Sequence, residues 1–198
     1  MKTALITGGL GFVGTHIAID LLKNKKVKKF ILLDNFGGYI NPTRKSFYDF
    51  RKKRLDLINN KIIERCDTNN FKSVLEIVKK YQPDIVFHTA ALPLAKLENL
   101  NTDEAKLGSV DSTVNLLDSI TLVQNIKKNY RCKRFIYISS SMVYGDFKTN
   151  KVNETSPVNP KEAYGTMKLA GEIITKGISK LNNIPYTIIR PSAVYGPT

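Results

Sequence analysis

Short runs of apolar residues alternate along the chain with longer segments in which apolar residues recur every three or four positions. The runs are rich in Val, Ile, Leu and Phe, as in parallel strands buried on both faces, and the longer segments have the spacing of amphipathic helices. The pattern predicts strands at 2–7, 29–34, 61–66, 84–88, 133–139 and 185–190. It predicts helices at 12–24, 46–58, 70–81, 102–129 and 161–182. This alternation indicates an α/β fold, a doubly wound parallel sheet with helices on both faces.

A glycine-rich segment follows the first predicted strand, where residues 8–14 read Gly-Gly-Leu-Gly-Phe-Val-Gly. Glycines permit a tight strand-to-helix turn and let a pyrophosphate approach the backbone, while the start of the next helix offers free N–H groups to that anion. The second strand ends in Asp34, about 20 residues further on, where a carboxylate accepts both ribose hydroxyls and repels a 2′-phosphate. The order of these features predicts a Rossmann-type site for NAD rather than NADP.

A tyrosine and a lysine, Tyr164 and Lys168, stand near the start of the last predicted helix. Residues spaced i and i+4 share a helix face, and a nearby ammonium lowers the pKa of a phenol, so that phenolate becomes a usable base near neutral pH. The cluster Ser139-Ser140-Ser141 offers a hydroxyl to hold the substrate oxygen whose proton that base removes. These residue types predict the oxidation of an alcohol, with the cofactor as hydride acceptor.

Taken together, the motifs resemble those of the extended short-chain dehydrogenases/reductases, in the NAD-dependent nucleotide-sugar epimerase/dehydratase branch (UDP-glucose 4-epimerase-like). They lie along the whole chain in the family's order. The residues that carry the resemblance are Thr7–Gly14, Asp34-Asn35, Cys66-Asp67, Phe87-His88-Thr89-Ala90-Ala91, residues 139–145 (SSSMVYG), residues 164–168 (YGTMK) and residues 190–197 (RPSAVYGP).

The resemblance implies a set of site residues. It makes Ser140, four residues before the tyrosine of Val-Tyr-Gly, catalytic together with Tyr164 and Lys168, and Ser141 could share the task of Ser140. Asp67 would bond the adenine amino group, although it could instead cap the helix that follows. The cofactor-binding residues implied are Gly8, Gly11, Phe12, Val13, Gly14, Asp34, Asn35, Asp67, Thr68, Thr89, Ala90, Ala91, Ser139, Tyr164, Lys168 and Pro191.

The reaction implied is a transient oxidation at C4 of a nucleotide-diphosphate sugar to a 4-keto intermediate. An epimerase returns the hydride to the other face of the ketone. A 4,6-dehydratase needs a further acid–base pair, which in that branch is Asp-Glu directly after the catalytic Thr. Because Ser141 and Met142 occupy those positions, we expect an epimerase. The alternatives are a 4,6-dehydratase or a decarboxylase, or a cofactor-binding module that is inactive because it is truncated.

Two stretches depart from the family pattern and leave the substrate open. Ser109-Val110-Asp111-Ser112-Thr113 stands where relatives have Asn-Val-x-Gly-Thr, and Ala193 replaces an Asn that contacts substrate in relatives. Family members also continue past the Tyr-Gly-Pro motif into a substrate-binding region. We therefore expect 1–198 to be the NAD-binding domain, with the C-terminal substrate domain largely absent. Relatives often pair through two long helices, which implies a homodimer through 102–129 and 161–182.

The composition of the chain narrows the class of protein to which it can belong. The chain has 198 residues, 42% of them hydrophobic, and no apolar run near the length of a membrane span. The first strand begins at Lys2 with no signal peptide before it, and Cys66 and Cys132 are expected to be reduced packing residues. We therefore expect a soluble, cytoplasmic protein without a membrane partner.

The net charge of +14 raises the possibility of a polyanionic partner. Residues 23–29 and 51–54 are dense in lysine and arginine, but no zinc-ligand set or RNA-binding signature accompanies them. A solvated, lysine-rich surface is the favoured interpretation over nucleic-acid binding. His88, at a buried strand end, is expected to be a packed, hydrogen-bonded residue rather than an acid or base, and no metal site is expected.

Overall fold

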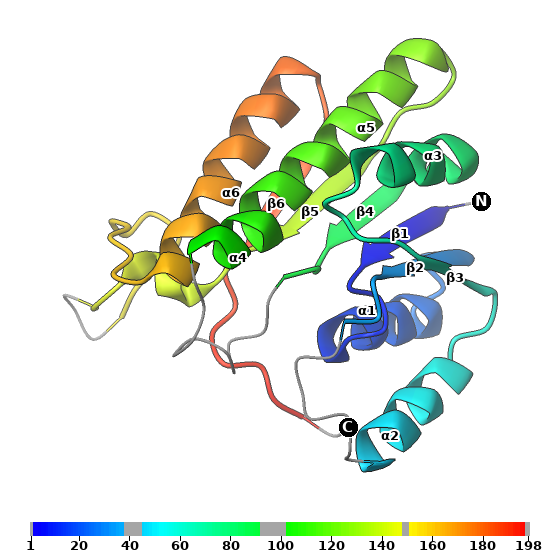
Figure 1. Ribbon diagram of the computed structural model, residues 1–198, viewed down its shortest axis with the longest axis horizontal. Coiled ribbons are helices and arrows are strands. Elements are labelled where there is room, and N and C mark those ends of the chain that lie inside the picture. The colour runs from blue at the N-terminus through cyan, green and yellow to red at the C-terminus, as the bar shows by residue number, and fades with distance from the viewer. Residues whose placement is uncertain (1, 38–44, 92–101, 148–150, 197–198) are drawn as a thin grey trace.

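The computed structural model describes residues 2–37, 45–91, 102–147 and 151–196, apart from the side chains of 45–49 (Figure 1). Six parallel strands form one sheet in the order β3-β2-β1-β4-β5-β6. Their bounds are β1 Thr3–Thr7, β2 Lys29–Asp34, β3 Lys61–Arg65, β4 Ile85–His88, β5 Arg134–Ile138 and β6 Tyr186–Ile189. This order is that of a doubly wound Rossmann sheet, which confirms the predicted fold class.

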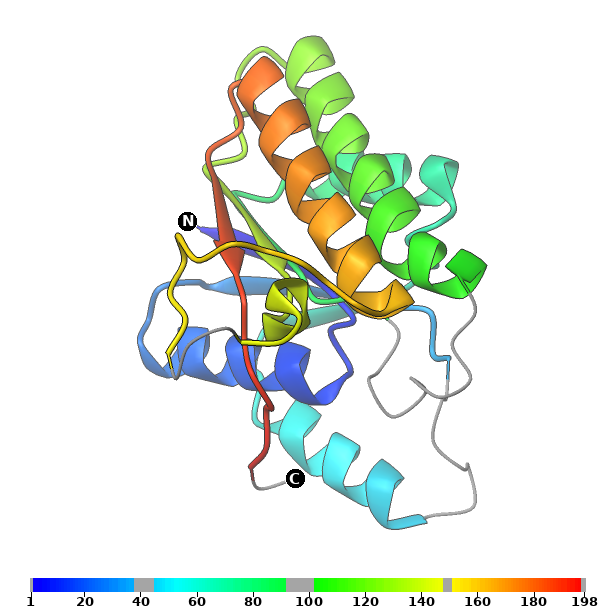
Figure 2. The ribbon, with the colours of Figure 1, turned by 90° about the vertical axis from the view of Figure 1, so that its left-hand side faces the viewer.

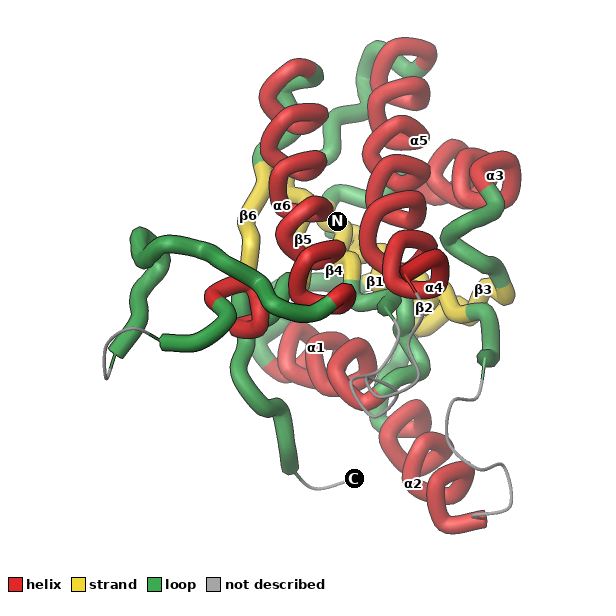
Figure 3. The backbone as a smooth tube through the Cα atoms, turned by 60° about the vertical axis from the view of Figure 1, so that its left-hand side comes forward, coloured by secondary structure: helices red, strands yellow, loops and turns green. Residues whose placement is uncertain are grey.

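Helices cover the sheet from both sides (Figure 3). The helices α3, α5 and α6 lie on one face, and α1 lies on the other, with α2 beyond it. The helices are α1 Phe12–Lys23, α2 Lys45–Asp56, α3 Phe71–Tyr81, α4 Thr102–Lys106, α5 Ser112–Ile126 and α6 Ala163–Leu181. Part of the loop predicted between the second strand and the second helix, residues 38–44, lies outside the described residues.

Two apolar clusters pack on the two faces of the sheet, and β2 shows how one strand serves both. Ile31 and Leu33 belong to the cluster beneath α3 and α5, whereas Phe30 and Leu32 belong to the cluster beneath α1. All four are at most 1% exposed. Successive side chains of a strand point to opposite faces, so a strand covered on both sides has to be apolar throughout.

The predicted helix 102–129 is wrong as a single element. It consists of α4, a π-helical turn at Leu107–Asp111, and α5, which ends at Ile126. The hydroxyls of Ser112 and Thr113 donate to the carbonyls of Gly108 and Ser109 around this turn, and such bonds compete with regular helix geometry. The helical spacing of apolar residues in a sequence does not show whether a π-helical turn interrupts the α-helix.

Close packing against α6 accompanies the π-helical turn. A Cβ atom at Gly171 would lie 2.8 Å from the carbonyl oxygen of Ser109, and it would overlap the Tyr137 hydroxyl. Only glycine therefore lets α6 approach both the turn and β5 at this level. Figure 2 shows α5 and α6 running side by side over the sheet.

Basic side chains lie in the last turns of several helices, including Lys23 of α1, Lys79 and Lys80 of α3, and Lys180 of α6. A cation at this end is favoured by the helix dipole, so these lysines have a local structural reason for their positions. Within the described ranges, no helix is long and apolar enough to cross a membrane.

Candidate nucleotide and catalytic site

The predicted site residues follow the carboxyl ends of neighbouring parallel strands. Thr7, the last residue of β1, pairs with Leu33 on one side and with His88 on the other, and His88 in turn pairs with Tyr137. The glycine loop, the β2 acid, Thr89 and the serine run therefore emerge at one edge of the sheet. Ligands of doubly wound sheets bind at this edge.

The glycine loop turns tightly between β1 and α1. Gly8 has a φ of +62°, and a Cβ atom there would lie 3.0 Å from the amide nitrogen of Ala90. A Cβ atom at Gly14 would lie 2.5 Å from the carbonyl oxygen of Gly8. Gly11 caps α1 without a side-chain hydrogen bond, so the amides of Phe12, Val13 and the residues after them have no side-chain acceptor at the cap. This open helix start fits a pyrophosphate.

The carboxylate of Asp34 lies beside this loop. It accepts hydrogen bonds from the amides of Leu10, at 3.1 Å, and Phe36, at 2.9 Å. An ionised carboxylate has about four acceptor positions, so these two bonds hold Asp34 in place and leave others for a ligand. Asn35 is exposed, and its side-chain oxygen accepts from the amide of Gly37.

Asp67 and Thr68 follow β3 at the same edge. The exposed Asp67 carboxylate accepts two hydrogen bonds from Asn69. The α3 helix is capped instead by Asn70, whose side chain accepts from the amide of Ser73, so the alternative role of Asp67 as the helix cap is wrong. Thr68 is buried, and its carbonyl accepts from the Asn115 side chain.

The segment after β4 is tied to β1. The Thr89 hydroxyl donates to the carbonyl of Thr7, and the Ala90 amide donates to the Thr7 hydroxyl at 3.1 Å. These bonds place Thr89, Ala90 and the half-buried Ala91 beside the glycine loop.

His88 is 1% exposed and lies between the hydroxyls of Thr7, at 2.8 Å, and Ser112, at 3.2 Å. Burial, with a smaller effect from the Lys168 charge, lowers the pKa of His88 to about 3. A ring that is neutral and bonded through both nitrogens is a packed residue, as expected from its position at a strand end.

Tyr164 and Lys168 lie in the first turns of α6, 8% and 3% exposed. The Lys168 ammonium donates to the carbonyl oxygen of Ile138 at 2.8 Å and lies 5.7 Å from the centroid of the Tyr164 ring. Burial lowers the pKa of Lys168 to about 8 and raises the pKa of Tyr164. The net shift of the Tyr164 pKa is therefore upward rather than downward as expected, because desolvation of the phenol decides its direction.

The three serines have different partners. The Ser140 hydroxyl accepts from the amide of Met142 at 3.2 Å, at the start of the 3₁₀ turn Ser141–Tyr144. Its own proton remains for donation. The Ser139 hydroxyl donates into the interior, to Glu172 at 2.6 Å. The Ser141 amide donates to the carbonyl of Pro191 at 2.9 Å, which brings Pro191 beside the serine run.

A buried ion pair behind the serine run was not predicted. Glu172 is 0% exposed and is held by two hydrogen bonds from Arg190, of 2.8 and 2.7 Å. Burial would raise the pKa of Glu172, but the bonds from Arg190 and Ser139 outweigh it and hold the pKa below its ordinary value. The available signals were the i, i+4 spacing from Lys168 and an arginine directly before Pro191.

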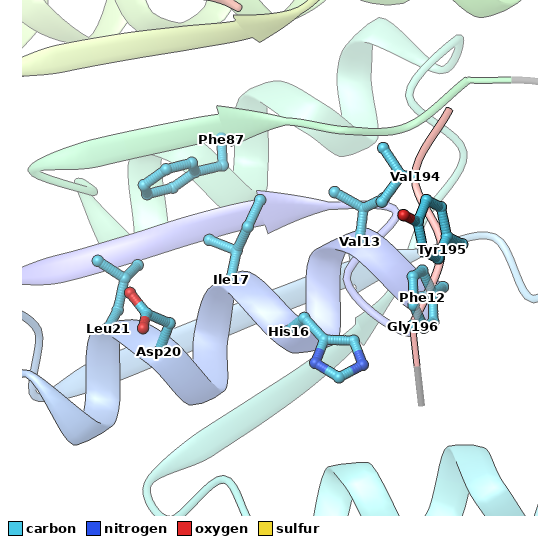
Figure 4. Close-up of a pocket in the computed structure, with 10 residues that line it drawn as sticks. All are labelled: Phe12, Val13, His16, Ile17, Asp20, Leu21, Phe87, Val194, Tyr195 and Gly196. Carbon is cyan, nitrogen blue, oxygen red and sulfur yellow. The ribbon is translucent and has the colours of Figure 1, made fainter. Parts of the chain in front are cut away.

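A separate groove of about 540 Å³ runs along α1, beside β4 and the segment 194–196 (Figure 4). It is lined mostly by apolar side chains of α1, by Phe87 and by residues 194–196, with His16 and Asp20 as its polar members. The side chains of Phe12 and Val13 point toward this groove. At the predicted cofactor site, these two residues therefore contribute their backbone amides. Ser140, Tyr164 and Lys168 do not line the groove, and its walls are apolar rather than suited to an anion.

The geometry agrees with comparisons to known proteins. The model of the NAD dependent epimerase/dehydratase family matches residues 4–198. The chain belongs to this family. NAD is the cofactor of the family, and the glycine cradle beside Asp34 fits that cofactor.

Similar members of the epimerase/dehydratase family include proteins named for two reactions. The chain is 29% identical over 217 residues to dTDP-D-glucose 4,6-dehydratase of Dictyostelium discoideum, covering 100% of this chain and 45% of that protein. It is 32% identical over 199 residues to the uncharacterized UDP-glucose epimerase YtcB of Bacillus subtilis, covering 98% and 57%.

Among solved structures, the UDP-glucuronic acid 4-epimerase of Bacillus cereus, in complex with UDP-glucuronic acid and NAD, matches with a TM-score of 0.81. The identity is 29%, and the match covers 99% of this chain and 58% of that one. The chain thus spans about half the length of the relatives it matches.

Proposed function

We propose that this chain is the cofactor-binding and catalytic part of a nucleotide-sugar 4-epimerase that acts through transient oxidation at C4 of the sugar. The observation that carries the proposal is the grouping of Tyr164, Lys168 and Ser140 at the strand ends that also hold the glycine cradle. A base, a cation and a hydroxyl donor beside a dinucleotide site suit the oxidation of an alcohol.

The cofactor would be held by groups already in place. The amides at the start of α1, with Gly8, Gly11 and Gly14, would hold the pyrophosphate, and Asp34 would accept the hydrogen bonds of the ribose hydroxyls. The adenine end would be held by Asn35, Asp67 and Thr68, and the nicotinamide end by Thr89, Ala90, Ala91, Lys168 and Pro191. Ser139, expected from the resemblance to contact the cofactor, instead donates its hydroxyl hydrogen bond to Glu172. When bound, NAD⁺ supplies the hydride acceptor and a positive charge at the nicotinamide ring.

Tyr164 takes the proton of the C4 hydroxyl, and Ser140 donates a hydrogen bond to the same oxygen as it becomes a ketone. Because burial raises the pKa of the phenol, it needs positive charge nearby to ionise. The ammonium of Lys168 is bonded to the carbonyl of Ile138. In this geometry Lys168 acts on the phenol as a neighbouring charge, and it is available to hold the nicotinamide ribose.

Epimerisation is favoured over dehydration because the 3₁₀ turn after Ser140 carries no carboxyl group. Ser141 and Met142 begin that turn, and neither can remove the proton from carbon or protonate the leaving hydroxyl during loss of water. The dehydratases among the relatives make 4,6-dehydration the alternative function.

The deciding test is incubation of the purified protein, expressed with its natural termini, with UDP- and dTDP-hexoses, followed by NMR of the products. We expect the C4 epimer without release of a keto sugar. A 4-keto-6-deoxy product would replace the epimerase by a dehydratase. Absence of turnover with every sugar would overturn the enzymatic proposal. The matched control is Tyr164→Phe, which removes the base while keeping the ring.

We further propose that two copies pair through α5 and α6. These helices lie side by side and carry exposed apolar residues (Figure 2). The exposed fractions are 41% for Leu122, 65% for Ile126, 62% for Ile173 and 81% for Leu181. Sedimentation should show a dimer that Ile173→Lys weakens and that Leu57→Lys, on another surface, does not. Monomer alone at high concentration would contradict pairing.

A cytoplasmic location is the last part of the proposal. Cys66 and Cys132 are both buried and free. Burial raises the pKa of Cys66 to about 11 and that of Cys132 to about 12, so both stay thiols. Free, unreactive cysteines suit a reducing compartment, and cell fractionation tests the location.

A further inference from the structure

The helix α6, which carries the proposed base, makes hydrogen bonds to two consecutive residues at the end of β5, Ile138 and Ser139. Lys168 donates to the carbonyl oxygen of Ile138, and Glu172 accepts a hydrogen bond of 2.6 Å from the Ser139 hydroxyl. Lys168 and Glu172 are spaced i and i+4, so both bonds come from one face of α6. Ser140, the proposed hydroxyl donor, follows directly after the second of these contacts.

The extension of β6 holds the same segment from the other side. The Ser139 amide donates to the carbonyl of Ile189 at 2.7 Å, and the Ser141 amide donates to that of Pro191 at 2.9 Å. Between those two acceptors lies Arg190, which donates from Nε and Nη2 to the two oxygens of the Glu172 carboxylate. Ser140 is thus flanked by residues that are tied to both α6 and β6.

Arg190 also reaches the turn that follows Ser140. It donates to the Tyr144 hydroxyl at 3.0 Å, and its guanidinium carbon lies 4.9 Å from the centroid of the Tyr144 ring. The Tyr144 hydroxyl in turn donates to the carbonyl of Asn153. Planar, forked contacts of this kind fix orientation as well as distance.

The Glu172 carboxylate itself is fully buried and bonded. It is 0% exposed, and its oxygens are occupied by Arg190 and Ser139, with the Lys176 ammonium at 3.9 Å. A buried charge is tolerated only when it is paired and hydrogen-bonded, so any displacement of its partners is resisted. Its effect on the site must therefore pass through the residues it holds.

We propose that Glu172 and Arg190 are positioning residues, which act through the Ser139 hydroxyl to hold Ser140 in a fixed place against Tyr164 and Lys168. This inference rests on the proposed function. It also gives Ser139 a role different from the cofactor contact expected of it, because its hydroxyl proton is directed to Glu172.

Ser139→Ala is the test, because it cuts the link and leaves the Glu172–Arg190 pair whole. The matched control is Ser179→Ala. Ser179 is a buried serine of α6, the helix that carries Glu172, and its hydroxyl has no partner within the described part of the chain. We expect kcat of Ser139→Ala to fall about 10- to 100-fold. The KM for the sugar nucleotide and the NAD⁺ affinity by calorimetry should match those of the control. The melting temperature of Ser139→Ala should fall below that of the control, because the buried Glu172 carboxylate loses a hydrogen bond. Ser139→Thr, which keeps a hydroxyl, should recover most of kcat.

A wild-type kcat in Ser139→Ala would overturn the inference, as would a loss of NAD⁺ affinity that accounts for the whole effect. Hydrogen exchange of residues 139–145 gives a readout that does not depend on turnover. Faster exchange in Ser139→Ala than in Ser179→Ala supports the anchor, and equal exchange overturns it. An inactive wild-type protein would overturn the proposed function, while the exchange result would still decide whether the ion pair holds this segment.

Discussion

The Lys168 ammonium donates a 2.8 Å hydrogen bond to the carbonyl oxygen of Ile138, the last residue of β5. This bond joins the helix that carries Tyr164 to the strand that leads into Ser140. It also leaves a cation in the interior, held by one carbonyl and by the faces of two rings, with Tyr137 at 5.3 Å and Tyr164 at 5.7 Å. The site therefore contains a charge whose burial opposes folding.

Replacing Lys168 by Met should raise stability at neutral pH while abolishing turnover. Burial lowers the pKa of Lys168 from 10.5 to about 8, so the folded chain binds this proton less tightly than the unfolded chain. Burying the protonated lysine therefore lowers the free energy of unfolding. This loss of stability is complete below about pH 8 and disappears as the pH rises toward 10.5.

We expect Lys168→Met to gain roughly 1–2 kcal/mol in unfolding free energy at neutral pH, because the bond lost at Ile138 offsets part of the relief. Urea unfolding of both proteins at neutral pH and near pH 10 measures the difference, which should shrink at the higher pH. A variant less stable than wild type at neutral pH would contradict this prediction.

Tyr164→Phe should lower turnover by about 10²- to 10⁴-fold, the usual contribution of a general base. The ring stays in place, and since burial favours the neutral phenol, no buried charge is lost. Stability and NAD⁺ affinity should therefore stay near wild type. Tyr186→Phe, at an exposed tyrosine of β6, serves as the control. Turnover of Tyr164→Phe at the wild-type rate would exclude Tyr164 as the base.

Two glycines in helices should respond in opposite directions to alanine. At Gly14 a Cβ atom would lie 2.5 Å from the Gly8 carbonyl oxygen, so the loop must shift. We expect Gly14→Ala to lower both the melting temperature and the affinity for NAD⁺. At Gly177 nothing lies within 4 Å of a new Cβ atom, and Gly177→Ala should stabilise the chain by about 0.5–1 kcal/mol. Thermal melts with and without NAD⁺ compare the two, and equal effects would contradict the steric argument.

Asp34 should decide between the two dinucleotides. A ligand that binds only the folded state raises stability by RT ln(1 + [L]/Kd), so a thermal-shift titration reports affinity. We expect a larger shift with NAD⁺ than with NADP⁺, and a smaller difference in Asp34→Ala. Asp34→Asn is the second variant, because its amide oxygen still accepts a bond from the amide of Leu10 or Phe36 while the charge is removed. A larger shift with NADP⁺ in the wild-type chain would contradict the role of Asp34.

The secondary structure and the glycine loop were predictable because their causes are local. The second strand was predicted at 29–34 and is found there, since a strand buried on both faces is a continuous apolar run. The first helix was predicted to begin at Phe12 and does so, directly after the glycines that permit the turn. Tyr164 and Lys168 share a helix face because spacing along a helix is itself a local property.

The sequence by itself thus determined the order of strands and helices, the doubly wound class and the edge where the candidate site residues gather. Only the tertiary structure decided the π-helical turn at Leu107–Asp111, the opposite pKa shifts of Tyr164 and Lys168, and the hydrogen bonds that Glu172 accepts from Ser139 and Arg190. The reason is physical. Desolvation and long-range pairing depend on which elements pack together, and residues distant in sequence, such as Ser139, Glu172 and Arg190, meet only once the sheet and its helices have assembled.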